Sequence, residues 1–96
     1  MIASNRTLEV VQNIDRHRFE IELDGQFAVL EYQIRGELIY FTHTGVPFEY
    51  RGQGIAGDLV LAGLTHAEVE TLKVVPLCSY VDVYIRRHRQ FEPLLA

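Results

Sequence analysis

The stretch Val46-Pro47-Phe48-Glu49-Tyr50-Arg51-Gly52-Gln53-Gly54-Ile55-Ala56-Gly57 decides the fold. Hydrophobic residues before it recur with the two-residue period of strands, and those after it recur every three or four residues, as in helices. Pro47 ends the preceding strand pattern, and the glycines at 52 and 54 come just before the helical one. The chain is therefore expected to pass from sheet to helix through this loop.

Upstream of the loop, the sequence predicts an antiparallel meander. Residues 18–23 alternate strictly, with Phe19, Ile21 and Leu23 on one face, which is typical of a half-buried strand. Asp24-Gly25 favours a tight turn in which both residues have positive φ, and Arg35-Gly36 marks a second turn. The predicted strands are Thr7–Gln12, Arg18–Leu23, Gln26–Ile34 and Glu37–Val46.

Downstream of the loop, we expect a helix over Ile55–Leu72, a strand over Lys73–Cys78 and a helix over Tyr80–Gln90. Because a helix connects strands 37–46 and 73–78, the two strands should run parallel. The fold class is thus α+β, with a mixed, mostly antiparallel sheet and two helices. Gly63, inside the first predicted helix, lowers the stability of that helix by about 1 kcal/mol relative to alanine. A close backbone contact at this position would explain why the residue is glycine.

Length, charge and composition limit the number of domains, the kinds of partner and the location that we expect. The 96 residues form one expected domain, 1–96, and the net charge of −4 argues against a nucleic-acid partner. With one cysteine and no apolar stretch near the roughly 20 residues that span a bilayer, we expect a cytoplasmic protein without membrane contact. No metal site is expected. The basic run Arg86-Arg87-His88-Arg89 is either a solvated helix face or a contact for a phosphorylated ligand.

The loop itself has the features of a pyrophosphate cradle. The first amides of a helix lack intrahelical acceptors and favour anions, Gly52 and Gly54 let a phosphate approach the backbone, and Arg51 adds a forked donor. Gly52-x-Gly54-x-x-Gly57 also matches the dinucleotide-binding fingerprint. Against that alternative, residues 47–51 separate the glycines from the strand, and residues 75–79 contain no acid to bind a ribose.

Arg51-x-x-Gly54-x-Ala56 matches the (Gln or Arg)-x-x-Gly-x-(Gly or Ala) pattern of the GNAT acetyltransferase superfamily. The chain resembles the small, stand-alone GNAT-like proteins of the N-acetyltransferase domain-containing type over nearly its whole length. The resemblance is carried by Arg18-Phe19-Glu20, Leu23-Asp24-Gly25, Leu30-Glu31-Tyr32, His43-Thr44, Val46-Pro47, the loop at 51–56, Pro76-Leu77-Cys78-Ser79-Tyr80-Val81 and Tyr84-Ile85-Arg86-Arg87-His88.

The resemblance implies a minimal GNAT fold without the early helices, an open acceptor site, and acetyl-CoA or CoA as the cofactor, its pantetheine arm between strands 37–46 and 73–78. It implies acetyl transfer to an amine, on a protein or a small molecule. Because a small domain with an open sheet edge can pair with a second copy, we expect a monomer or a weak homodimer. The implied cofactor-binding residues are Val46, Arg51, Gly52, Gln53, Gly54, Ile55, Ala56, Gly57, Tyr84, Arg87 and His88. Gly45 stands where relatives carry glutamate, and Arg89 where they often carry proline, so a non-catalytic CoA-binding module is the alternative.

Four residues are candidates for catalysis. A lysine-like amine must lose a proton at a cost of about 4.6 kcal/mol at pH 7, and Glu49 and His43 are the ionisable residues nearest the cradle. Glu49 is otherwise a solvated carboxylate, and His43 a structural histidine. Cys78 either protonates the leaving thiolate, accepts the acetyl group, or packs as a small apolar residue. Tyr84 matches the position of a tyrosine acid in many GNAT enzymes, or is a core aromatic residue.

Overall fold

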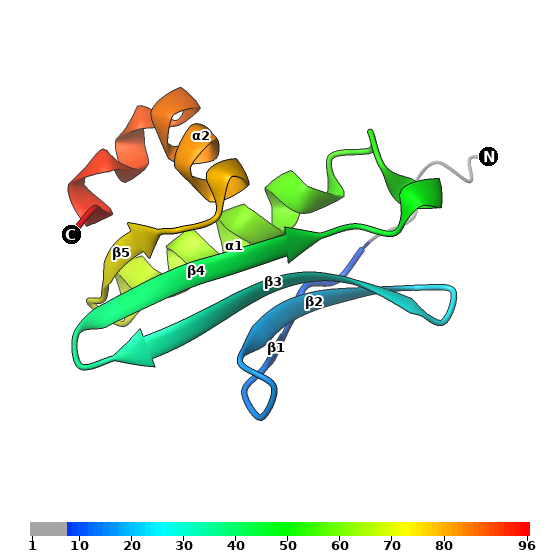
Figure 1. Cartoon of the computed structure of the whole chain (residues 1–96), viewed down its shortest axis with the longest axis horizontal. Coiled ribbons are helices and arrows are strands. Elements are labelled where there is room, and N and C mark those ends of the chain that lie inside the picture. The colour runs from blue at the N-terminus through cyan, green and yellow to red at the C-terminus, as the bar shows by residue number, and fades with distance from the viewer. Residues whose placement is uncertain (1–7) are drawn as a thin grey trace.

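A computed structural model describes residues 8–96. Its five-stranded sheet has the order β1-β2-β3-β4-β5, formed by Val11–Asn13, Arg18–Leu23, Gln26–Arg35, Leu38–Gly45 and Lys73–Pro76 (Figure 1). The first four strands are antiparallel neighbours, and β5 pairs parallel to β4. The helices are α1 (Ile55–Val69) and α2 (Ser79–Arg87), with short 3-10 helices η2 (Phe48–Tyr50) and η3 (Arg89–Leu94). The expected α+β class and the parallel pairing across α1 are confirmed.

The bounds of six elements differ from the sequence prediction. β3 ends one residue later, at Arg35, β4 is one residue shorter at each end, and α2 begins one residue earlier, at Ser79. β1 begins at Val11, and Thr7 lies outside the described residues. α1 ends at Val69, not at Leu72, because Thr71 is left-handed with φ 58°. β5 ends at Pro76, short of residue 78. α2 ends at Arg87, not at residue 90, because His88 leaves the helical region with φ −127° and ψ 75°.

The core lies on one face of the sheet. α1 contacts strands β2 to β5, and α2 contacts β4, β5 and α1. Gly63 faces the sheet at the closest approach of α1: a Cβ there would stand 2.8 Å from Leu30 Cδ2 and 2.9 Å from Phe41 Cε1. The cost of a glycine within the helix thus has a steric reason. The buried residues are Phe19, Ile21, Leu23, Ala28, Leu30, Tyr32, Ile39, Phe41, Ile55, Leu59, Val60, Leu64, Ala67, Val74, Val81, Ile85 and Phe91.

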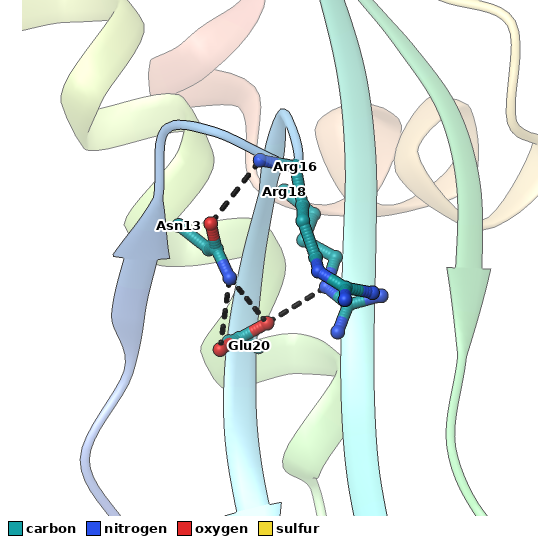
Figure 2. Close-up of polar contacts among 4 residues, drawn as sticks. All are labelled: Asn13, Arg16, Arg18 and Glu20. Atoms are coloured by element: carbon teal, nitrogen blue, oxygen red, sulfur yellow. Dashed lines mark hydrogen bonds and ion pairs between the residues drawn. The ribbon is translucent and has the colours of Figure 1, made fainter.

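The other face of the sheet is more polar and is called the open face below. Its residues alternate with the buried ones, and in the pairing register Arg18 lies opposite Glu31, which in turn lies opposite His43. Figure 2 shows the polar group at the β1–β2 end of this face: Arg18 Nε lies 2.7 Å from Glu20 Oε2, and Asn13 Nδ2 donates to both Glu20 oxygens at 3.4 Å. The Asn13 side chain also accepts the Arg16 amide at 3.1 Å. These contacts hold β1 to β2 and occupy the Glu20 carboxylate.

The outer edge of β5 is covered. Val74 forms a parallel bridge with Leu95, and the Ala96 amide donates to the Val74 carbonyl at 3.0 Å. Strand pairing with another chain through this edge is therefore blocked. In the described part of the chain, no helix is both long enough and apolar enough to cross a membrane.

Candidate functional site

β4 and β5 separate partway along their length. They pair from Leu38 opposite Lys73 to Phe41 opposite Pro76, and the Cys78 amide makes one further bond to the Phe41 carbonyl at 2.9 Å. At the same level the β3–β4 register shifts by one residue, so that Thr42 is an extra residue on β4. Such a bulge bends a strand and increases its twist. The last residues of β4 consequently diverge from β5 and leave a gap.

A cavity of about 600 Å³ opens at this gap. It is formed by the end of β4, the loop before α1, the start of α1 and one residue of α2. Its size lies in the range of small-molecule and cofactor sites. The lining residues are His43, Thr44, Gly45, Val46, Tyr50, Arg51, Gly52, Gly54, Ile55, Ala56 and Tyr80.

The two loop glycines adopt a backbone that other residues resist. Gly52 has φ 81° and Gly54 has φ 80°, both left-handed, and a Cβ on either would meet nothing within 4 Å. The space beside them is therefore open, and backbone conformation is the reason for glycine. Gly54 is the N-cap of α1, and its carbonyl accepts the Asp58 amide at 3.1 Å as the helix begins. The free amides of the first turn thus border the cavity, as a diphosphate requires.

Side chains attach this loop to its surroundings. The Arg51 Nε donates to the Val46 carbonyl at 3.1 Å, and its guanidinium lies 5.6 Å from the centre of the Phe48 ring. The Tyr50 hydroxyl donates to the Asp24 carboxylate, which ties the loop to the β2–β3 turn. Asp24 and Gly25 have φ 53° and 88° in that turn, as predicted. Arg51 is exposed and keeps further N–H groups for an anion.

Cys78 lies behind the wall of the cavity rather than in its lining. Its Sγ is 3.2 Å from the Thr44 Oγ1, and Thr44 does line the cavity. Burial raises the pKa of the thiol, but the hydrogen bond with Thr44 and the backbone amides of Val81, Tyr80 and Thr44 together lower it below the ordinary 9.0. Cys78 is the N-cap of α2, where the helix dipole also favours a thiolate. The thiol is half-buried and within one side chain of the gap.

A model of the family described as GCN5-related N-acetyl-transferase matches residues 18–94. The chain belongs to the GCN5-related N-acetyltransferase family. Protein NATD1 of Gallus gallus is 34% identical over 84 residues, which cover 84% of this chain and 76% of that protein. Protein NATD1 of Homo sapiens is 37% identical over 76 residues, covering 76% and 67%.

A solved structure shares the fold. The solution structure of a GCN5-like putative N-acetyltransferase from Staphylococcus aureus superposes with a TM-score of 0.75 at 27% identity, covering 93% of this chain and 88% of that one. The minimal GNAT fold expected from the sequence is thereby confirmed. In this GNAT domain, the cavity lies at the β4–β5 gap where the sequence analysis expected the pantetheine arm.

Tyr84 lies outside the main cavity of the GNAT domain, beside a second hollow of about 150 Å³ lined by Tyr80, Val83, Tyr84, Arg87 and His88. Its ring stacks on His88 with centroids 3.9 Å apart, and the His88 Nδ1 is 2.8 Å from the Tyr84 carbonyl oxygen. Burial raises the pKa of Tyr84, and Tyr80 and Asp58 add to the rise, so the phenol stays protonated at neutral pH. The hollow brings predicted cofactor-binding residues together around an aromatic face.

The remaining predicted residues are placed as follows. His43 is exposed and lines the cavity, whereas Glu49 is an exposed residue of η2 outside the lining. Gly57 faces α2: a Cβ there would stand 3.7 Å from the Tyr80 hydroxyl oxygen and 3.8 Å from Tyr84 Cε2. Gln53 is exposed in the loop, outside the lining.

Sequence reasoning assigned no role to three residues that line the main cavity, Thr44, Tyr50 and Tyr80. Tyr80 borders both the main cavity and the second hollow, so it joins the two spaces. Its place two residues after Cys78 was the available signal, because Cys78 was expected at the end of the strand that borders the gap. Arg86 pairs with Asp82 at 2.9 Å and Arg89 with Glu92 at 3.3 Å, so within the basic run Arg87 and His88 are the residues that line the hollow.

Proposed function

We propose that this GNAT domain binds acetyl-CoA and transfers the acetyl group to an amine. The observation that carries the proposal is the pair of left-handed glycines at the start of α1, which open onto the same cavity as the end of β4. Backbone amides of residues 54–57 would bind the diphosphate, with Arg51 at the edge. Arg87 and the stacked Tyr84–His88 pair, in the adjoining hollow, would contact the nucleotide end.

Acetyl-CoA supplies an acetyl thioester, whose carbonyl carbon is the electrophile. The chain's task is then to align an amine, to remove its extra proton, and to return a proton to the departing sulfur. Thr44 lines the cavity, and Cys78 contacts it from behind, so a small displacement of Thr44 would give the thiol access to the gap. We assign to Cys78 the return of the proton, with direct acceptance of the acetyl group as the second chemical role.

Tyr84 would serve as the alternative proton donor. Its pKa is raised by burial, which suits a donor that must stay protonated, but its place beside the second hollow is less direct than that of Cys78. Both residues also have packing roles, since Tyr84 stacks on His88 and Cys78 packs at the edge of the core. Turnover of variants at the two positions therefore has to decide which residue donates the proton.

The test measures coenzyme release with a panel of amines for the wild type, Cys78→Ala, Cys78→Ser and Tyr84→Phe. A chemical role for Cys78 requires a large loss of turnover with coenzyme affinity retained, and protection of the thiol from alkylation by CoA. If Cys78→Ala keeps its turnover and the wild-type thiol does not react in the folded protein, Cys78 is a packing residue and Tyr84 becomes the donor.

A second candidate function is binding without transfer. It is favoured by Gly45, a residue of the cavity wall that provides no side chain for proton transfer. Coenzyme binding accompanied only by slow hydrolysis, with no stimulation by any amine, would establish this function in place of the first.

A further inference from the structure

His43 and Gly45 share the open face of β4, and the imidazole lies back over the glycine. A Cβ on Gly45 would stand 3.1 Å from His43 Nε2 and 3.8 Å from its Cε1. Gly45 is not among the positive-φ glycines, so its backbone would accept another residue. Glycine at 45 is thus explained by room for the imidazole, which fills the space of the missing side chain and borders the cavity with it.

A carboxylate stands beside this imidazole. Glu31 on β3 is the cross-strand partner of His43, and such partners have Cβ atoms about 4.5–5.5 Å apart. The Glu31 carbonyl oxygen accepts the Thr42 hydroxyl at 3.3 Å, but within residues 8–96 its carboxylate has no recorded ion pair. The neighbouring Glu20 is different, since Arg18 and Asn13 occupy it (Figure 2).

We propose that an alkylammonium acceptor enters over the open face, where Glu31 binds its charge and His43 Nε2 removes its proton. This inference rests on the proposed function and deepens it by naming the acceptor class and the base. Histidine is the side chain that most often takes a proton from a reacting group as a general base. The alkylammonium loses two protons in the reaction. His43 takes the first, and the free amine then forms the N–C bond to the acetyl carbon as the C–S bond breaks. The departing sulfur takes the thiol proton of Cys78, and the second proton that the nitrogen loses restores that thiol.

The shape of the open face agrees with such an acceptor. β2, β3 and β4 present this face on the side opposite the buried residues, and Phe27 on it is 44% exposed. A long alkylammonium, whether a free polyamine or a lysine side chain on a peptide, can therefore reach His43 without displacing a described element.

The experiment separates binding of the coenzyme from transfer. Calorimetry with CoA and turnover with a polyamine, a lysine peptide and an alcohol are measured for the wild type and for five variants: His43→Ala, His43→Gln, Gly45→Ala, Glu31→Gln and the double variant H43A/G45A. Preference for the polyamine or the peptide identifies the source of the amine. His17→Ala is the control, because His17 is an exposed histidine of the β1–β2 turn, away from the cavity.

We expect His43→Ala and His43→Gln to lower kcat/KM about 100-fold, with the affinity for CoA unchanged. Added imidazole should raise kcat/KM of His43→Ala by at least about tenfold, and should not raise that of His43→Gln. Gly45→Ala moves the imidazole ring by a few tenths of an ångström and should lower kcat/KM about fivefold. In the His43→Ala background the same change should have no further effect, because the ring is absent. Glu31→Gln should raise KM for the amine about tenfold with kcat retained.

The inference is wrong if turnover of His43→Ala is within twofold of the wild type, if imidazole does not rescue this variant, if turnover with the alcohol is equal, or if Glu31→Gln leaves KM for the amine unchanged. A wild type that binds CoA and transfers to no amine also overturns it. If the wild type fails to bind CoA at all, the proposed function itself is wrong, and the two failures are thus distinguished.

Discussion

Gly54→Glu tests whether the start of α1 holds a diphosphate. Gly54 has φ 80°, and a Cβ there points into open space beside the cavity. The new carboxylate would therefore stand in the cradle at roughly 5 Å from two phosphate charges. The repulsion between the carboxylate and each phosphate charge is about 1–3 kcal/mol for an effective dielectric constant between 80 and 20. The sum of about 2–6 kcal/mol predicts a Kd for CoA weaker by about 30-fold to 25,000-fold.

The strain of this variant needs a matched control. A non-glycine residue in the left-handed region costs about 1–2 kcal/mol, which lowers the Tm of a small domain by about 4–8 °C for each kcal/mol. Gly36→Glu makes the same change at φ 59° in the turn that begins β4, where a Cβ also meets nothing within 4 Å. Both variants should lose similar stability, and only Gly54→Glu should lose affinity in calorimetry. A folded Gly54→Glu protein with affinity within threefold of the wild type would refute the reasoning, and so would equal losses of affinity in the two variants.

Two further predictions concern the thiol and the helix. Burial raises the pKa of Cys78, and the Thr44 hydrogen bond is the largest effect that lowers it. Thr44→Val should therefore shift the midpoint of Cys78 alkylation to a higher pH than in the wild type. An unchanged midpoint would mean that Thr44 does not bind the thiolate. Gly57→Ala and Gly63→Ala gain the same helix propensity, but only the Cβ at 63 would stand under 3.0 Å from Leu30 and Phe41 atoms. Gly63→Ala should thus be less stable than Gly57→Ala by about 1–3 kcal/mol in urea unfolding, and equal stability would contradict the packing described.

Local patterns were sufficient for much of the fold. The alternation over residues 18–23 predicted β2 with its observed bounds, and Asp24-Gly25 predicted a turn with two positive φ angles. The parallel pairing of β4 and β5 followed from the connecting helix. The ends of the helices did not follow, because Thr71 is a left-handed residue without a glycine to signal it, and His88 leaves α2 for a 3-10 helix.

In the site, too, features set by neighbouring residues could be predicted and features set by distant contacts could not. The glycine cradle is formed by consecutive residues, so residues 51–56 predicted it. Tyr80 lines the cavity because α2 contacts β4, and no periodicity reports a contact between elements so distant in sequence. The departure at Gly45 was visible in the sequence, but its explanation needed the position of the His43 ring. Likewise, the cost of Gly63 was visible, whereas the side chains of Leu30 and Phe41 that require it lie on two strands.

Calorimetric titration of the wild-type protein with acetyl-CoA, beside a titration with NAD, tests the central claim most directly. The cradle at Gly52 and Gly54, with the cavity at the β4–β5 gap, predicts saturable binding of one acetyl-CoA per chain. It also predicts a higher unfolding temperature in the presence of acetyl-CoA, because a ligand that binds only the folded state stabilises it. No heat and no rise in unfolding temperature at millimolar acetyl-CoA, or saturable binding of NAD instead, would contradict the account.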